Sequence, residues 1–250
     1  MAEPTIDDVL VQLDAIIDVA RRRGSADGYF AALYRRVTAM VKERAAAGGF
    51  QDGARMIRFD VLFASRYTTA WLARERGETT SEVWDVALGC DRAYWPVVLQ
   101  HLLVGMNAHI NLDLGIAAAE CAPGESIHQL ESDFNAINEV LCAMIDDVQI
   151  RLAKVWPALR VIDRVCGDFD EAVVNFSIRR ARDQAWQLAL TLAAQSSERE
   201  RLQTIQQVDR AMSLIGRRVL RPGVGLALKL AWVRLRERGS VAEKIRVMLD

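Results

Sequence analysis

The segment from Val97 to Ala122 constrains the fold more than any other part of the 250-residue chain. It is predominantly apolar and long enough to cross a bilayer, which takes about 20 residues. Seven of its side chains are nevertheless polar or ionisable: Gln100, His101, Asn107, His109, Asn111, Asp113 and Glu120. Because such groups are costly in lipid, the segment predicts a buried central helix of a soluble protein rather than a membrane span.

The rest of the chain has the pattern of helices packed around such a core. Apolar residues recur at steps of three and four, as between Val9 and Ala20, and strand-like alternation is nearly absent. The five prolines fall at plausible starts or stops of helices. We expect helices at about 6–23, 26–46, 53–76, a short one after 80–81, 95–122, 126–155, a shorter segment up to 166–167, 168–195, 197–220 and 225–250. This predicts one all-α domain over residues 1–250, a bundle of about nine helices, with about 222–250 as an appended C-terminal helical arm.

Charge and cysteine content narrow the classes of partner. The chain has 32 basic and 33 acidic residues, so it has no excess of cations for a nucleic-acid backbone. A basic patch between Arg217 and Arg238 is interpreted as a solvated helix face. Four widely spaced cysteines predict neither a disulfide framework nor a structural zinc site, and the acidic N-terminus lacks a signal-peptide pattern. We expect a cytoplasmic protein that binds a small molecule and no nucleic acid.

The polar residues of the central helix are the best candidates for chemistry. At about 100° per residue, His101, His109, Asp113 and Glu120 lie on one side of this helix, and Gly105 leaves a gap between the two imidazoles. Imidazole and carboxylate suit a divalent metal such as Zn, Fe or Mn. One hypothesis is therefore a metal site formed by His101, His109, Asp113 and, from the next helix, Asp133. The alternative is a buried hydrogen-bond network that fixes helix register.

Catalysis without a metal is a second possibility for the same residues. His109, polarised by Asp113 or Asp133, would act as a general base. A buried Arg66 would pair with Asp113 or Asp133, or bind an anionic substrate, and Arg182 is expected to pack against Trp186. The predicted catalytic residues are His109, Asp113, Asn138 and Arg182, and the predicted substrate-binding residues are Asn107, Arg66, Tyr67 and Asp60.

The run Asn107–Leu114, Asn-Ala-His-Ile-Asn-Leu-Asp-Leu, resembles the hallmark of an uncharacterised bacterial family, a domain of unknown function. Segments 59–67, 133–138 and 181–186 are also similar to that family, and the resemblance covers about residues 28–195. It implies an all-helical fold and no established activity. A weaker likeness links His109 and Asp113 to the all-α zinc phospholipase C and nuclease group, but His128 is the one remaining histidine, so a trinuclear zinc site is not expected.

These observations lead to hypotheses from different classes. The first is an enzyme with a buried His/Asp/Asn pocket that hydrolyses an ester or phosphoester, with a divalent metal or by acid–base catalysis. The second is a non-enzymatic helical bundle that binds an apolar small molecule, and the third is a purely structural polar network. A metal oxygenase and a terpene-cyclase-like enzyme are minor alternatives. The latter is disfavoured because Asp146-Asp147 lacks the third acid of a prenyl-phosphate motif.

Overall fold

The computed structural model describes residues 4–91, 93–137, 141 and 178–249. Secondary structure in this part of the chain is entirely helical. The fold is all-α and is organised around a long, buried central helix, as the sequence predicts.

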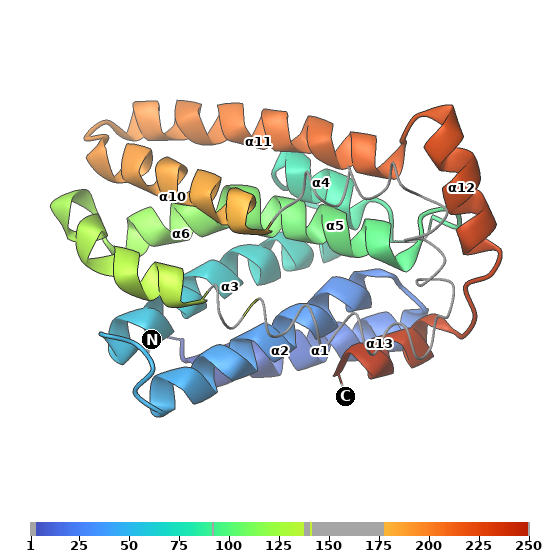
Figure 1. The fold of residues 1–250 in the computed structure, drawn as a ribbon, viewed down its shortest axis with the longest axis horizontal. Coiled ribbons are helices and arrows are strands. Elements are labelled where there is room, and N and C mark those ends of the chain that lie inside the picture. The colour runs from blue at the N-terminus through green and yellow to red at the C-terminus, as the bar shows by residue number, and fades with distance from the viewer. Residues whose placement is uncertain (1–3, 92, 138–140, 142–177, 250) are drawn as a thin grey trace.

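The first three helices begin and end close to the expected residues. They are α1 (Ile6–Arg23), α2 (Asp27–Ala46) and α3 (Gly53–Glu75) (Figure 1). Local signals set their ends: a capping box of Thr5 and Asp8 begins α1, and Gly24 ends it at a φ of 64°. Asp52 caps α3 by accepting a hydrogen bond from the backbone of Arg55.

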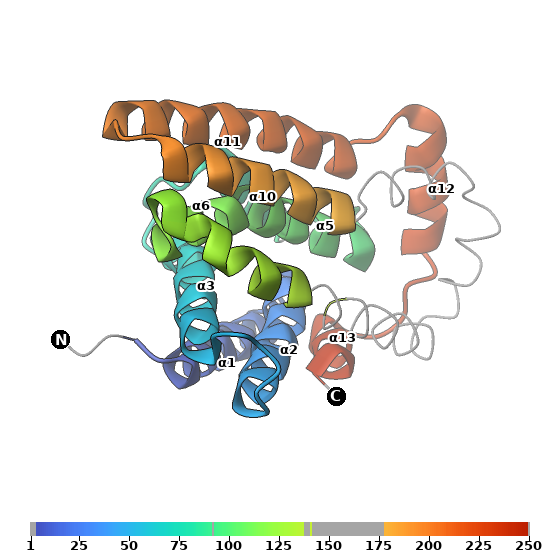
Figure 2. The same ribbon diagram turned by 60° about the vertical axis from the view of Figure 1, so that its left-hand side comes forward.

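The short α4 (Glu82–Leu88) precedes the central rod, which consists of α5 (Val98–Ala108), the π-helical turn η1 (His109–Asp113) and α6 (Leu114–Cys121). In Figures 1 and 2 this rod lies between α2 and α3 on one side and α10 (Ile178–Ala194) and α11 (Glu198–Leu220) on the other. Val98–Cys121 has a length and hydropathy compatible with a membrane span, and 94% of its apolar window is buried by the rest of the chain. Such burial is typical of a core helix.

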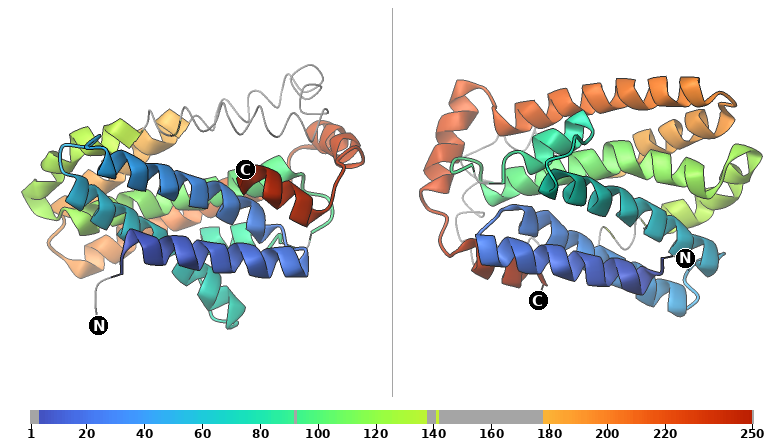
Figure 3. Two further views of the ribbon diagram at one scale, coloured as in Figure 1. Left: turned by 90° about the horizontal axis from the view of Figure 1, so that it is seen from below. Right: turned by 180° about the vertical axis from the view of Figure 1, so that it is seen from behind.

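The C-terminal segment departs from the single helix expected over 225–250. It forms α12 (Val224–Arg234) and α13 (Val241–Leu249). Gly239 has a φ of 83°, and Ser240 accepts a hydrogen bond from the backbone of Glu243. This cap starts a new helix, so the prediction of one helix was wrong. Figure 3 shows α13 folded back beside α1 and α2, where Ile245 packs against Gly28.

The remaining expected helices lie partly outside the described residues. After the 3-10 turn η2 (Gly124–Ser126), residues 127–137 are helical. They belong to the helix expected over 126–155. Beyond residue 137, the structure describes residue 141 of that range. The helix expected over 168–195 is described from Ile178, where α10 starts.

Buried side chains bonded to backbone groups hold the central rod in place. The amide of Gln100 donates to the carbonyl of Val219 at 2.7 Å, and that of Asn107 donates to the carbonyl of Met212 at 2.9 Å. The carboxylate of Glu237 accepts from the backbone N–H of Val98 at 2.9 Å. Because an unpaired buried polar group costs about 1–3 kcal/mol, these bonds fix how α5 sits against α11 and the C-terminal segment.

Candidate functional site

The two most suggestive residues of the sequence meet on the π turn of the central rod. His109 and Asp113 are the first and last residues of η1, and each is 2% exposed. Nδ1 of His109 lies 3.2 Å from Oδ2 of Asp113. A π turn inside an α-helix is uncommon and occurs frequently at functional sites. The sequence does not predict this turn, because its apolar pattern continues through it.

Asp113 is held by donors from two further helices. Nε1 of Trp84 donates to Oδ2 at 2.9 Å, and Nε of Arg66 donates to Oδ1 at 3.1 Å. The predicted pairing of Arg66 with Asp113 is therefore confirmed. Arg66 also lies 3.5 Å from the carboxylate of Glu120. Because both oxygens of the Asp113 carboxylate accept hydrogen bonds, Nδ1 of His109 carries the proton and donates it. Nε2 is then the unprotonated nitrogen, which can accept a hydrogen bond.

Nε2 of His109 is buried and has no hydrogen-bond partner among the described residues. Burial lowers the pKa of His109 below its usual 6.5, against the opposing effect of Asp113. The imidazole is therefore neutral at pH 7. Buried polar atoms are almost always paired in folded proteins, so an unpaired basic nitrogen indicates a ligand, a water molecule or a reacting group at this point.

Aromatic rings from three helices surround His109. Phe63 stacks on its imidazole with centroids 3.6 Å apart and planes 6° apart, and Tyr34 meets it edge-on at 4.4 Å. The remaining three rings lie at 5.6–6.2 Å: Phe30, Tyr67 and Trp84. We call these five rings the aromatic cage. Its walls are of low polarity, which strengthens any electrostatic interaction made inside it.

A second buried titratable residue, Asp60, lies close enough to Tyr34 of the aromatic cage for its charge to raise the pKa of that tyrosine. Asp60 is 4% exposed, and its Oδ2 has no partner among the described residues. Burial raises the pKa of Asp60 to about 7. Burial also raises the pKa of Tyr34, and the charges of Asp60 and Asp113 raise it further. The environment thus pushes the pKa values of Asp60 and His109 in opposite directions, an arrangement typical of acid–base pairs in enzymes.

A polar cleft of about 720 Å³ opens beside α1–α3. Trp71 and Ser25 line it, together with five charged residues: Arg23, Asp27, Arg74, Glu75 and Asp91. Burial and the neighbouring Asp91 raise the pKa of Asp27 to about 7. The charge of Asp27 in turn contributes to the raised pKa of Tyr67, whose ring belongs to the aromatic cage.

One face of α3 connects this cleft with His109. Phe59, Phe63, Tyr67 and Trp71 follow one another at steps of four, so they share one side of the helix. Trp71 lines the cleft, and Phe63 stacks on His109. The four-residue spacing was the signal in the sequence that could have revealed this stripe.

His101, predicted as a metal ligand, lies apart from His109. Its Nδ1 is 3.3 Å from the sulfur of Cys90, and burial lowers its pKa to about 4. The gap expected at Gly105 is filled by Phe30, because a Cβ at Gly105 would lie 2.7 Å from that ring. The ring of Phe30 therefore occupies the gap that was expected to admit another backbone or a ligand.

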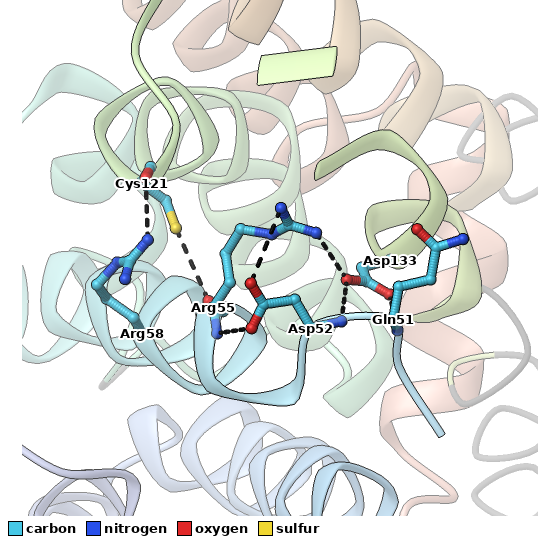
Figure 4. Close-up of polar contacts among 6 residues, drawn as sticks. All are labelled: Gln51, Asp52, Arg55, Arg58, Cys121 and Asp133. Atoms are coloured by element: carbon cyan, nitrogen blue, oxygen red, sulfur yellow. Dashed lines mark hydrogen bonds and ion pairs between the residues drawn. The ribbon is translucent and has the colours of Figure 1, made fainter. Parts of the chain in front are cut away.

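Asp133 was the expected fourth ligand and serves a different purpose (Figure 4). Its Oδ1 accepts from the backbone N–H of Gln51 at 2.6 Å. Its Oδ2 accepts from the backbone N–H of Asp52 and from Arg55, both at 3.0 Å. Asp133, 1% exposed, thus holds the start of α3 against the helix over residues 127–137. Within the described residues, no group of three His, Cys, Asp or Glu side chains is arranged to hold a metal ion, and the proposed ligand set does not come together.

Two other predicted site residues, Asn107 and Arg182, also have contacts away from His109. The Asn107 amide bonds to Met212, and its Oδ1 accepts from Asn111 at 3.1 Å. Arg182 donates to the carbonyl of Phe134 and stacks on that ring at 4.3 Å. Trp186 contacts the same ring, at 4.8 Å, so Arg182 and Trp186 share Phe134. Asn138 lies outside the described residues.

Comparisons with known proteins place this fold and site in a family without an assigned activity. No curated protein and no solved structure gives a significant match. The model of a family of unknown function, DUF5995, matches residues 6–222. That range includes the aromatic cage and the charged cleft and ends before α12. The resemblance seen in the sequence is confirmed, and the chain belongs to the family of unknown function DUF5995.

Proposed function

We propose that the protein is an enzyme in which His109 acts as a general base on a small, uncharged, largely apolar substrate. The observation that carries this proposal is the unpaired, buried Nε2 of His109, whose ring is oriented at Nδ1 by Asp113. A carboxylate that fixes the tautomer and position of an imidazole is the usual way to prepare its second nitrogen for proton transfer.

The reaction class that best fits these groups is hydrolysis of an uncharged ester. Nε2 of His109 would take a proton from water while the water oxygen attacks the carbonyl carbon. As the tetrahedral intermediate collapses, the bond to the leaving oxygen breaks and protonated Asp60 would supply that oxygen with a proton. The proton held by His109 then restores Asp60, so the net reaction is ester plus water to acid plus alcohol.

The surroundings favour an uncharged substrate over a phosphoester. The five rings of the aromatic cage provide an apolar wall, and a phosphoester anion would lose its hydration there. Arg66, the cation bonded to Asp113, is already paired with that residue and with Glu120. Trp71, which lines the charged cleft, shares one side of α3 with Phe63, the ring that stacks on His109.

The test is an ester panel of graded chain length, such as p-nitrophenyl acetate to octanoate. Replacing His109 by Gln should lower kcat/KM by about 10²–10⁴, and Asp113→Asn should lower it through loss of imidazole orientation. His128→Gln is the matched control, because this histidine is exposed. Full activity in His109→Gln, or no hydrolysis of any ester by the folded protein, would overturn the proposal.

A second candidate function is non-enzymatic binding of an apolar small molecule. The specific observation in its favour is the stacking of Phe63 on His109 at 3.6 Å, a flat aromatic arrangement suited to a ring-containing ligand. Native mass spectrometry of the purified protein would distinguish the two functions. A bound molecule that is retained unchanged, and lost in His109→Gln, supports binding and contradicts turnover.

A further inference from the structure

The helix α12 is apolar on two opposite sides. Leu230 and Val233 are buried against the protein. Val224, Leu228, Trp232 and Leu235 are between 37 and 79% exposed. At about 100° per residue these four side chains fall within about 80° of one another, so they form a single stripe on the outer face. We call them the outer stripe. An exposed apolar stripe of this kind indicates a surface that meets something other than water.

Two exposed aromatic residues lie beside α12. Tyr94 and Trp95 are 60 and 61% exposed, and their rings contact edge-on at 5.3 Å. Arg234 of α12 ties them to the helix, since it donates to the carbonyl of Tyr94 and stacks on its ring at 4.8 Å. Figure 1 shows α12 and the segment before α5 together at one end of the molecule.

The same end carries a strong positive charge. Residues 217–238 contain seven Arg and Lys residues and one acidic residue, whereas the whole chain has a net charge of −1. Five of the arginines are exposed: Arg217, Arg218, Arg221, Arg236 and Arg238. The guanidinium of Arg236 lies 3.6 Å from the centroid of Trp232, so charge and aromatic surface adjoin at the edge of the outer stripe. The charge is therefore concentrated beside the apolar surface.

We propose that this end of the protein docks peripherally on an anionic lipid bilayer. Leu and Val of the outer stripe would enter the boundary between headgroups and acyl chains, as in interfacial amphipathic helices. Trp and Tyr are the residues that favour this boundary, and each Arg near an anionic leaflet contributes further attraction. A bilayer of this charge complements both the apolar and the cationic part of the surface. The proposal is independent of the chemistry at His109.

The experiment is co-sedimentation of the full chain with vesicles of phosphatidylcholine alone or with one third phosphatidylglycerol. We expect binding to the anionic vesicles that weakens as salt is raised and little binding to the neutral ones. Leu228→Ser combined with Leu235→Ser should lower the partition coefficient at least about tenfold. Arg217→Glu combined with Arg218→Glu should lower it for anionic vesicles alone.

The controls use exposed residues away from this end. Val11→Ser removes an apolar side chain that is 68% exposed on α1, and Arg199→Glu reverses an exposed charge at the start of α11, the end of that helix remote from α12. Both should bind vesicles as the unmodified chain does. The proposal is overturned if anionic vesicles do not bind the protein, or if the outer-stripe variants bind them unchanged. A lipid-free dimer that the same variants convert to monomer would assign the surface to a second copy and would also overturn it.

Discussion

Arg66 connects Asp113, which is 2% exposed, to Glu120 at the surface, with distances of 3.1 Å and 3.5 Å. A positive charge so close to the dyad also helps to lower the pKa of His109. Replacing Arg66 by Met should therefore raise the pKa of His109, measured by NMR titration of the three histidines. Arg58→Met, on an exposed position of the same helix, is the matched control. An unchanged His109 titration in Arg66→Met would show that Arg66 does not act on the dyad.

The proposed acid–base pair predicts an optimum on the acidic side of pH 7. His109 must be neutral, so activity rises with pH as pH passes the lowered pKa of His109. Asp60 must be protonated, so activity falls as pH rises through its pKa of about 7. The profile of kcat/KM should be bell-shaped, and Asp60→Asn should lower the maximum. A profile that keeps rising to pH 9 would exclude Asp60 as the acid.

Asp60 also predicts how stability depends on pH. Its pKa is about 7 in the folded protein against 3.8 in a model peptide, so its contribution is present at low pH and is lost as pH rises through 7. Asp60→Asn should therefore be more stable than the unmodified chain at pH 8, by up to about 4 kcal/mol. The difference should shrink as pH falls towards 4. Urea unfolding at pH 5 and pH 8 measures both values, and Asp18→Asn, an exposed position on α1, should show no such trend.

Replacing Asp133 should lower the stability of the protein without lowering its activity. Asp133→Asn weakens the contacts to two backbone N–H groups and to Arg55. This should cost about 2–4 kcal/mol, because it weakens two buried backbone contacts and removes the nearer of the two carboxylates that pair with the part-buried Arg55. Activity per folded molecule should remain that of the unmodified chain. The exposed Glu131→Gln in the same helix serves as a control, and abolished activity in folded Asp133→Asn would restore Asp133 as a site residue.

Gly105 predicts the effect of a single added methyl group. A Cβ there would lie 2.7 Å from two atoms of the Phe30 ring, which belongs to the aromatic cage. Gly105→Ala should destabilise the fold by about 1–3 kcal/mol, and Phe30→Leu in the same chain should recover part of that loss. Gly225→Ala, which meets open space in α12, should be neutral or stabilising by up to about 1 kcal/mol. Thermal unfolding of the four proteins provides the comparison.

Local signals explain which parts of the fold could be predicted. Periodic apolar residues and caps such as Thr5 and Gly24 are encoded in neighbouring positions, so helix boundaries were accessible. The cap formed by Ser240 and Glu243 is local in the same way, so the sequence contains a signal for the start of α13. The packing at Gly105, by contrast, depends on Phe30, which another helix places there, and no periodicity reveals this contact. The single-domain organisation and the cytoplasmic location remain predictions.

In the candidate site, the contact within one helix was predictable, and the contact that Asp133 makes between helices was not. The pairing of His109 with Asp113 follows from their spacing of four residues, which survives the π turn. Asp133 was expected near Asp113 because an antiparallel hairpin at Pro123-Gly124 would bring its helix back alongside the central one. The actual partner of Asp133 is the start of α3, because buried backbone N–H groups there need an acceptor.

The π turn divides the central rod into two parts that pack against different helices. Residues of α5 face α2, α4 and α11, whereas those of α6 face α3 and α10, and His109–Asp113 is the joint between these two settings. A π turn holds about one residue more than an α turn, so removing one residue from the joint would restore an α-helical turn and leave Leu114–Cys121 facing α3 and α10 much as before. Among relatives, a one-residue gap within this pentapeptide would thus mark a regular helix rather than a displaced α6.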